Sequence, residues 1–271
     1  MAHNIKFSVL LSLYKGEKAQ FFDEAMQSIY EQTLSPTEIV LVQDGPLNKD
    51  LYDVIESWKG RLNIVDVVIA NNVGLGEALN QGLQHCSYEL VARMDTDDIA
   101  LPTRFEKQIA AFDLQNIDVC GSWISEFDHD PSTILSIRQV PEYHADITKF
   151  AKSKNPMNHP SVMFKKTTVV KCGGYQNVLY FEDYFLWLSL IKSGAILYNI
   201  PSPLVHMRAG LNQLSRRSGY LYFKREFNFF KKSYKSKLLP LGDVLKNMAL
   251  RMPLRLLPKA IIAKIYSLLR N

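Results

Sequence analysis

The sequence is poor in cysteine and contains no long uninterrupted apolar run. Its 3 cysteines among 271 residues stand far apart and form no CxxC pair, so a disulfide framework is not expected. This usage is typical of reduced thiols in a cytosolic protein. No apolar stretch reaches the roughly 18 residues that a membrane-spanning helix requires. The run from Phe7 to Leu13 is shorter, and no small-residue cleavage site follows it, so we expect a buried strand there.

Two common nucleotide-binding patterns are also absent. The chain lacks the GxGxxG pattern of dinucleotide-binding proteins and the GxxxxGK[ST] pattern of one large class of nucleotide hydrolases. It has no internal repeat and no low-complexity tract. With 47% hydrophobic and 22% charged residues, the composition is that of a folded protein. The length suits one large domain, or one domain with an appendage.

Acidic residues are scarce only in the last part of the chain. Residues 207–271 carry 15 Lys/Arg but only Glu226 and Asp243 as acids, a balance of +13. Residues 1–206 carry 17 basic and 25 acidic side chains, a balance of −8. The formal net charge of +5 therefore hides a cationic tail on an acidic body, which favours an anionic partner for the tail alone.

Short apolar runs alternate with helical patterns in the first half of the chain. The runs are nearly continuous in Val, Ile and Leu, as in strands buried on both faces. The expected strands are Lys6–Leu13, Glu38–Gln43, Leu62–Ala70, Glu89–Met94 and Asp118–Ser125. The expected helices are Lys18–Gln32, Asp50–Trp58, Gly76–His85 and Pro102–Leu114, with Pro102 in the first turn of the last. This alternation predicts an α/β fold with a doubly wound, mostly parallel, Rossmann-like sheet and ligands at its carboxyl edge.

The alternation fails after Ser125. Residues 126–160 contain several prolines and are expected to be rich in loops. A short strand is expected at Ser161–Lys165, followed by a glycine turn and a helix at Glu182–Ser193. We expect Pro253 and Pro258 to break the basic tail into short helices.

An acidic motif follows the fourth expected strand. Arg93–Asp98 has the sequence RMDTDD, so three carboxylates (Asp95, Asp97 and Asp98) stand where a buried strand ends. Such carboxylates repel one another unless a cation intervenes, and their hard oxygen ligands suit Mg²⁺ or Mn²⁺. The alternative is a polar turn in which Asp97 or Asp98 caps the following helix.

Two further strand ends carry polar groups. Asp44 ends the second strand before a Gly-Pro turn, where its carboxylate can accept the imide N–H of uracil; a plain turn residue is the alternative. Asn72 lies between the third strand and a helix whose N-terminus can favour a diphosphate. Each feature alone is weak, but all would meet at one edge of the sheet.

Taken together, these motifs resemble those of family 2 glycosyltransferases with the GT-A fold, over roughly residues 5–230. The segments SVLLSLYKGE, NVGLGEALNQG, RMDTDD and FEDYFLW, with Asp44 at its strand end, occur in the order and spacing of that family. Within it, the chain looks like bacterial enzymes that build surface polysaccharide on a lipid carrier, including amylovoran and O-antigen galactosyl- and glucosyltransferases. The implied division is a GT-A domain at 1–215, with a nucleotide-binding half (1–98) and an acceptor half (99–215), and a helical region at 216–271.

The resemblance implies donor-side roles for several positions. Tyr14 matches the residue that packs near the uracil, and Asp44 matches the carboxylate that recognises the base. Arg93 and Asp95 match positions around the ribose and diphosphate. Asp97 and Asp98 complete the metal-presenting pattern; which of the three aspartates touches the ion stays open.

The resemblance also assigns the acceptor side. In FEDYFLW, Asp183 matches the catalytic base, and Glu182 would hold the loop or help to bind the acceptor; acids at a helix N-terminus before a core face are the alternative. His159 and Trp187 are expected to line the acceptor side, and His206 to lie near the diphosphate or metal, although a lone histidine is more often simply packed. Arg216 and Arg217 are candidates for gripping a phosphate.

These residue types fit one reaction. A divalent cation neutralises charge on a departing nucleotide diphosphate, and one carboxylate takes the proton of the attacking hydroxyl. One base and one attack imply inversion, so a UDP-hexose (galactose or glucose) would give a β-linkage, with a leaning to β1,3. The implied acceptor is a polyprenyl-diphosphate-linked sugar such as GlcNAc-diphosphoundecaprenol.

The basic tail favours contact with an anionic membrane surface, because apolar and basic residues interleave along it. The expected location is therefore the cytoplasm, peripherally on the inner face of the cytoplasmic membrane. A helical hairpin with a solvated basic face is the alternative. A non-catalytic nucleotide-sugar sensor and a nucleic-acid-binding protein are the competing functions; no nucleic-acid motif is present, and no nucleic-acid partner is expected.

Overall fold

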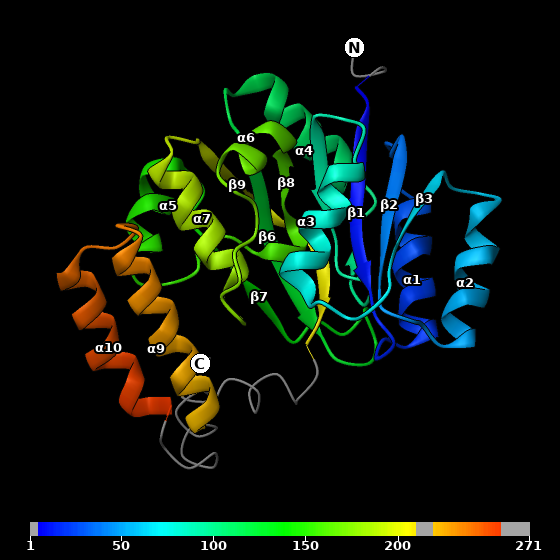
Figure 1. Cartoon of the computed structure of the whole chain (residues 1–271). Helices are drawn as coiled ribbons and strands as arrows, with labels where there is room; N and C mark the ends of the chain where they lie inside the picture. The colour runs from blue at the N-terminus through cyan, green and yellow to red at the C-terminus, as the bar shows by residue number, and fades with distance from the viewer. Residues whose placement is uncertain (1–4, 210–218, 256–271) are drawn as a thin grey trace.

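The computed structural model describes residues 5–209 and 219–255 (Figure 1). Its centre is one mixed sheet with the strand order β3-β2-β1-β4-β8-β6-β9-β5, and β7 pairs with β6. The first part of this sheet is parallel and consists of β1 (Phe7–Leu13), β2 (Glu38–Asp44), β3 (Ile64–Ile69) and β4 (Leu90–Arg93). β2 is buried along its whole length and β1 along nearly all of it, which explains their continuous apolar runs.

The second part of the sheet mixes strand directions. β8 (Met163–Lys165) runs antiparallel between β4 and β6 (Val119–Phe127), and β9 (Leu197–Arg208) runs parallel to β6. Two short strands, β5 (Ile99–Ala100) and β7 (Ser136–Arg138), pair antiparallel with β9 and β6. The predicted mostly parallel α/β sheet is confirmed, with these antiparallel additions.

The long strand β9 was not predicted, because Pro201 and Pro203 lie within it. Proline removes a ladder hydrogen bond and is tolerated at edges and bulges. The β6–β9 pairing has register shifts around Trp123, next to these prolines, so the strand continues past them. The expectation of loops over residues 126–160 was also wrong in part, since that stretch contains β7 and α5 (His144–Ala151).

Helices cover both faces of the sheet. One face packs against α1 (Ala19–Tyr30), α2 (Lys49–Lys59) and α4 (Arg104–Leu114). The other packs against α3 (Leu75–His85), α5, α6 (Lys166–Lys171) and α7 (Glu182–Lys192). β1 shows the alternation, since Val9 and Leu11 join the first core and Leu10 joins the second.

Helix α4 begins later than predicted. Its N-cap is Thr103, so Pro102 lies before the first turn, and neither Asp97 nor Asp98 caps the helix. The acidic motif is therefore not explained by capping. A single turn of 3-10 helix, η1 (His159–Ser161), precedes β8.

Two C-terminal helices pack at the end of the molecule near α5 and α7, away from α2 (Figure 1). They are α9 (Tyr220–Lys235) and α10 (Leu241–Arg255), and they share a core with α7 that includes Phe229 and Tyr184. Glu226 of α9, fully buried, forms ion pairs with Arg251 and Arg255 of α10.

The predicted C-terminal helical region is confirmed, but the break at Pro253 is not, because α10 continues through that residue. Pro258 lies outside the described residues, as do Leu256, Leu257, Lys259 and Lys264 of the basic tail. Within the described part of the chain, no helix is both long and apolar enough to cross a membrane.

Candidate active site

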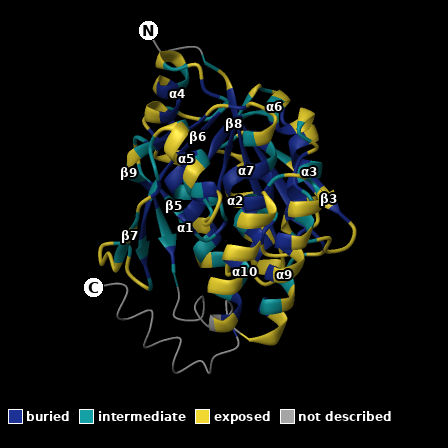
Figure 2. Ribbon diagram, turned by 90° about the vertical axis from the view of Figure 1, so that its left-hand side faces the viewer, coloured by how far each residue is buried: buried dark blue, intermediate teal, exposed yellow. Residues whose placement is uncertain are grey.

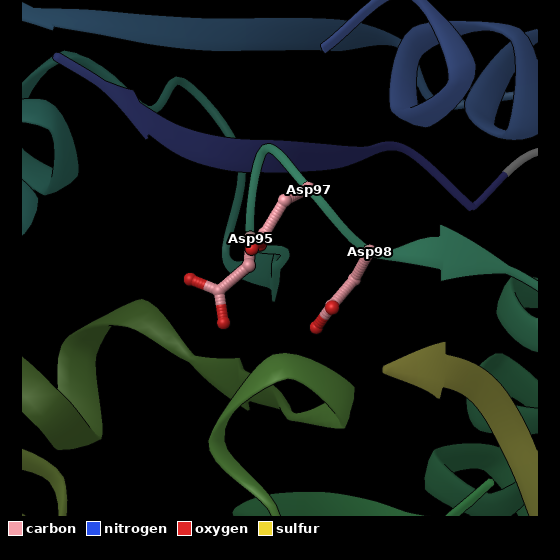
Figure 3. Close-up of side chains that lie close together, drawn as sticks. All are labelled: Asp95, Asp97 and Asp98. Carbon is pink, nitrogen blue, oxygen red and sulfur yellow. The ribbon is translucent and has the colours of Figure 1, made fainter. Parts of the chain in front are cut away.

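Three carboxylates lie together on the loop between β4 and β5. Asp95, Asp97 and Asp98 each offer an oxygen atom, and these atoms lie within 4.8 Å of one another. Figure 3 shows the side chains of Asp95 and Asp98 pointing to the same side of the loop. The loop leaves β4 at the carboxyl edge of the parallel strands, where ligands of such sheets usually bind.

Arg93 holds the first of these carboxylates from inside the protein. Its two Nη atoms donate hydrogen bonds to the two carboxylate oxygens of Asp95, one of them 2.7 Å long. Arg93 is only 1% exposed, whereas Asp95 is partly exposed. This buried, bidentate arginine supports the site through Asp95, and its expected contact with ribose or diphosphate stays a prediction.

Asp98 has an unsatisfied acceptor. Its Oδ1 accepts a hydrogen bond of 2.9 Å from the backbone N–H of Arg208, while its buried Oδ2 has no partner within residues 5–209 and 219–255. Burial, and next the charge of Asp95, raise the pKa of Asp97 to about 7 and that of Asp98 well above its usual value. A buried orphan oxygen beside two more carboxylates is an arrangement that a hard divalent cation stabilises. The described residues therefore fit Mg²⁺ or Mn²⁺.

Arg208, at the end of β9, closes the other side of the acidic loop. Its Nε donates a 3.2 Å hydrogen bond to the carbonyl oxygen of Asp97, and its Nη2 donates one of 2.5 Å to Glu24 on α1. The guanidinium lies over the rings of Phe21 and Phe127. Arg208 was not predicted as a site residue. It is 110 positions from Asp98 in the sequence, and it lies in β9, the strand that was not predicted because of its prolines.

Asp44 orders the loop that follows β3. Its carboxylate accepts hydrogen bonds from the backbone N–H groups of Val73 (2.7 Å) and Gly74 (3.1 Å) and from Nδ2 of Asn72 (2.9 Å). At Gly45 (φ +85°), an added Cβ would lie 2.8 Å from the backbone N of Asn72, so the two segments can approach only with glycine there. Asp44 and Asn72 thus meet at one sheet edge, and their contacts with a nucleotide stay predictions.

Tyr14 lies at the same edge, on the loop after β1. Its ring covers Gly16, where an added Cβ would come within 2.4 Å of the ring, and Tyr14 remains 48% exposed. Glu17 in this loop accepts a 3.1 Å hydrogen bond from the Thr96 hydroxyl, which ties it to the acidic loop. Tyr14 thus offers a half-exposed ring at the ligand edge of the sheet, and its contact with a planar base stays a prediction.

The second acidic group starts helix α7. Asp183 Oδ2 accepts a 2.6 Å hydrogen bond from Nδ2 of Asn155, and Oδ1 accepts one of 2.7 Å from the backbone N–H of Tyr184. Burial raises the pKa of Asp183, and hydrogen bonding by Asn155 opposes the rise. Both oxygens are thus oriented, and the carboxylate is more basic than a solvated one. Asn155 was not predicted as a site residue, although it precedes the predicted His159 by only 4 positions.

Tyr175 and Arg93 link the two acidic groups. Burial raises the pKa of the buried Tyr175 hydroxyl, the positive charge of Arg93 opposes that rise, and the charges of Asp183 and Asp95 both add to it. Arg93 also acts on the pKa of Asp183, against the larger effect of burial. Asp95 and Asp183, from distant stretches of the chain, therefore lie within electrostatic range of one tyrosine. Tyr175 also packs beside Glu182, since an added Cβ at Gly76 would lie 3.4 Å from the Tyr175 Cβ and 3.1 Å from the Glu182 Cγ. That the two acidic groups act on one substrate stays a prediction.

The two residues expected on the acceptor side, Trp187 and His159, differ in their exposure. Trp187 is 0% exposed and belongs to the core, so an acceptor cannot reach it. His159 is partly exposed; its Nε2 lies 2.9 Å from the Tyr175 hydroxyl, and its ring packs edge-on against Trp187. Burial, and next the charge of Arg93, lower the pKa of His159 well below its usual value, which favours the neutral imidazole. Its contact with an acceptor stays a prediction.

The remaining predicted site residues are His206 and the two tail arginines. His206 of β9 pairs with Ile99, just beyond Asp98, but its ring bonds to the Ser125 hydroxyl and packs against Phe127. Its contact with a metal or diphosphate stays a prediction. Arg216 and Arg217 lie outside the described residues.

Comparison with known proteins agrees with the sequence motifs. The family model described as glycosyl transferase family 2 matches residues 8–182. Over 226 residues the chain is 42% identical to the amylovoran biosynthesis glycosyltransferase AmsE of Erwinia amylovora, covering 83% of this chain and 84% of that protein. Over 267 residues it is 39% identical to the UDP-Gal:alpha-D-GlcNAc-diphosphoundecaprenol beta-1,3-galactosyltransferase of Escherichia coli, covering 96% and 95%.

A solved structure shares the fold. The mannosyltransferase PcManGT from Pyrobaculum calidifontis, in complex with GDP-Man and Mn²⁺, aligns with a TM-score of 0.65 at 16% identity. The alignment covers 99% of this chain and 81% of that one. At this identity the likeness concerns the fold, and it agrees with the predicted GT-A arrangement.

Proposed function

The chain belongs to glycosyl transferase family 2, and from this premise we propose that it is a metal-dependent, inverting hexosyltransferase. It transfers galactose or glucose from a UDP-sugar to a lipid-diphosphate-linked sugar, GlcNAc-diphosphoundecaprenol in the first instance. The observation that supports the proposal is that Tyr175, which packs beside Glu182 at Gly76, lies within electrostatic range of both Asp95 and Asp183. A cation site next to a separate oriented carboxylate is what transfer with inversion requires.

Asp183 acts as the general base. The acceptor hydroxyl approaches its carboxylate and loses a proton to it as the oxygen attacks the anomeric carbon. Asn155 and the Tyr184 N–H hold the carboxylate in place, and its raised pKa makes it a better proton acceptor than a solvated aspartate. Because the nucleotide leaves from the opposite face and no carboxylate nucleophile takes part, an α-linked donor gives a β-linked product.

The donor side is built on the acidic loop. Asp95, Asp97 and Asp98 would hold a divalent cation, which when bound supplies positive charge for the departing diphosphate. Arg93 fixes the carboxylate of Asp95, and Arg208 fixes the carbonyl group of Asp97 and the carboxylate of Asp98. Tyr14 and the Asp44–Asn72 loop stand at the same sheet edge and would receive the uridine.

The named relatives support the choice of substrates. The Escherichia coli relative carries UDP-Gal, a GlcNAc-diphosphoundecaprenol acceptor and a β1,3 linkage in its name, and the Erwinia relative acts in amylovoran biosynthesis. By analogy with these relatives, we propose that the present chain acts in O-antigen or exopolysaccharide assembly and forms a β1,3 linkage.

Contact with an anionic membrane is part of the proposal. Figure 2 shows mostly exposed residues on the outer faces of α9 and α10. Exposed apolar and basic side chains alternate there: Phe227, Tyr234, Leu241, Leu245 and Leu250 with Lys231, Lys235, Lys237 and Lys246. Such a surface can lie against anionic headgroups at the inner face of the cytoplasmic membrane, where a polyprenyl acceptor resides. Flotation with anionic but not neutral liposomes would test this contact.

A donor screen tests the reaction. The purified chain is offered UDP-galactose, UDP-glucose and UDP-GlcNAc with a GlcNAc-diphosphate-lipid analogue and Mn²⁺, and the product is analysed by NMR. We expect one β-linked hexose on the analogue. An α-linked product would contradict inversion, and UDP-sugar binding without transfer to any acceptor would favour a nucleotide-sugar sensor instead.

A further inference from the structure

Helix α9 supports the segment that leads into the catalytic carboxylates. Phe181, which directly precedes Glu182, stacks on Phe229 of α9 with ring centroids 4.8 Å apart and an interplanar angle of 17°. Tyr184 contacts the same ring, also at 4.8 Å. The C-terminal helices and the start of α7 are therefore one packed unit, and α9 side chains next to Phe181 stand beside the acceptor side of the site.

Tyr180 has an unusual backbone in this segment. Its φ is +73°, in the left-handed region that residues other than glycine rarely adopt, and its side chain is 50% exposed. Such strain persists where the surroundings over-determine it, and it is concentrated at functional sites. Here the ring is held by α9, since it lies 6.2 Å from the Tyr222 ring and carries the guanidinium of Arg225 at 4.2 Å from its centroid.

Arg225 is a partly exposed cation on α9. Within residues 5–209 and 219–255 it forms no ion pair or hydrogen bond, and its contact is the face of Tyr180. Stacking fixes the plane of the guanidinium and leaves its N–H donors free at the edge, where they can bind phosphate oxygens in pairs.

The charge of Arg225 reaches the catalytic pair. Burial raises the pKa of Glu182, and Arg225 is among the groups that oppose the rise, so its guanidinium lies within electrostatic range of that carboxylate. Glu182 in turn packs against the start of α3, because an added Cβ at Gly76 would lie 3.1 Å from its Cγ. Arg225 therefore stands on the α9 side of the Glu182–Asp183 pair, on a different element from the acidic loop.

We propose that Arg225, stacked on Tyr180, is a phosphate subsite for the acceptor. This inference rests on the proposed function, in which the acceptor is a sugar diphosphate ester. With the acceptor hydroxyl at Asp183, the diphosphate on the same sugar needs a cation that is separate from the donor's metal carboxylates, and Arg225 supplies one. Leu221, one turn earlier on α9 and 60% exposed, lies on the same helix face and gives the lipid chain an apolar exit.

The test compares two acceptors that differ only in the phosphates. One is the α-GlcNAc diphosphate ester of a long-chain alcohol, and the other is the phosphate-free GlcNAc glycoside of that alcohol. For Arg225→Gln we expect kcat/KM to fall about 10- to 100-fold with the diphosphate ester and to change less than about twofold with the glycoside. The KM for the UDP-sugar should not change. Arg225→Lys should restore part of the loss, because it keeps the charge but not the planar fork.

A matched control is available on the other side of the molecule. Arg61 also lies over an aromatic ring, that of Trp58, at 5.2 Å, but it follows α2, far from the C-terminal helices. Arg61→Gln should leave both acceptors unaffected. Equal losses with both acceptors for Arg225→Gln would overturn the proposal and make Arg225 a support for the loop. An effect confined to the UDP-sugar KM would overturn it in favour of the donor diphosphate.

Direct binding separates this subsite from the proposed reaction. Calorimetric titration of both compounds into the wild type and Arg225→Gln, with UDP and Mn²⁺ present, requires no turnover. Tighter binding of the diphosphate ester that Arg225→Gln abolishes supports the subsite even if transfer is never detected, in which case only the reaction assignment fails. Equal binding of both compounds to the wild type would overturn the subsite, whatever the activity.

Discussion

The two acidic groups of the site, Asp95–Asp98 on the loop after β4 and Glu182–Asp183 at the start of α7, differ in how their carboxylates are hydrogen-bonded. Around Asp98, three carboxylates lie within 4.8 Å of one another, and one buried oxygen has no partner in the described residues. Around Asp183, one carboxylate has both oxygens hydrogen-bonded, by Asn155 and by the backbone of its own helix. Among the described residues Arg93 pairs with Asp95 only, so the first group keeps more negative charge than its arginine neutralises, whereas the Asp183 carboxylate of the second group is fully hydrogen-bonded.

This difference indicates which group binds a cation and which accepts a proton. Burial raises the pKa of all three buried aspartates. At Asp97 and Asp98 the next largest effect is the charge of Asp95, which adds to the rise, whereas at Asp183 it is the hydrogen bond from Asn155, which opposes the rise. Repulsion is relieved by a shared cation, and an oriented carboxylate with a moderately raised pKa suits a general base. Substitutions in the acidic loop should therefore weaken metal binding, whereas substitutions at Asp183 should slow the reaction and leave metal binding unchanged.

The largest effect is expected for Asp183→Asn. Removing the base should lower kcat by about 10³-fold or more, because proton removal then has no positioned acceptor. Binding of UDP-sugar and Mn²⁺ should be unchanged, since Asp183 belongs to the other acidic group. Steady-state kinetics and calorimetry measure the two properties separately. Asp113→Asn, an exposed acid at the end of α4, serves as the control, and appreciable turnover by Asp183→Asn would remove its role as base.

Asp98→Asn should reduce activity about 10²-fold and weaken Mn²⁺ binding strongly, because it neutralises the buried carboxylate that has an unpartnered oxygen. Removing metal with EDTA should abolish activity in the wild type, and added Mn²⁺ should restore it. Metal titration by calorimetry distinguishes this variant from Asp183→Asn, in which metal binding stays normal. Full activity of the wild type in EDTA would contradict a metal-binding role for the acidic loop.

Asn155→Ala should have a moderate effect, about tenfold on kcat/KM at neutral pH. Asn155 stabilises the charged form of Asp183, so its loss should raise the pKa of that carboxylate further. The base works when deprotonated, so the acid limb of the pH–rate profile should move to higher pH while metal affinity stays the same. An unshifted limb would mean that Asn155 does not tune the base. Asn155→Asp keeps the size of the side chain but removes the N–H donor to Asp183, so it should shift the acid limb in the same direction.

The smallest effect concerns stability without metal. The pKa of Asp97 is raised from 3.8 to about 7 in the folded chain, so its protonated form favours folding. That contribution is present below about pH 4 and is lost as the pH rises toward 7. In EDTA, we expect the melting temperature of the wild type to fall by a few degrees more between pH 5 and pH 8 than that of Asp97→Asn. Mn²⁺ should raise the wild-type value more at pH 8; equal gains at both pH values would contradict a cation bound to ionised carboxylates.

Much of the fold followed from local patterns. The continuous apolar runs of β1 and β2 and the helical patterns after them predicted the parallel half of the sheet. Asp44 and the RMDTDD motif could be predicted as site residues because each stands where a buried strand ends, at the edge of the sheet that binds ligands. Glu182–Asp183 stood out as an acidic pair at the start of a predicted helix. The second half was less predictable, since Pro201 and Pro203 conceal β9.

Partner choice inside the site could not be predicted from these patterns. Arg93 was expected to contact the nucleotide, and in the structure it is a buried hydrogen-bond partner of Asp95. Trp187 was expected to contact the acceptor, and its side chain lies in the core. Both residues lie in elements that were predicted correctly. Their roles depend on which side chains the neighbouring elements bring against them.

The sequence by itself determined which residue types stand at the ends of strands and helices, because strand alternation and helix periodicity fix the direction of side chains locally. Only the tertiary structure decided which carboxylates receive hydrogen bonds and which is left without a partner. Arg208 reaches Asp98, and Asn155 reaches Asp183, through the order of strands in the sheet. A local pattern carries no information about such long-range pairing, and in this protein that pairing separates the cation site from the base.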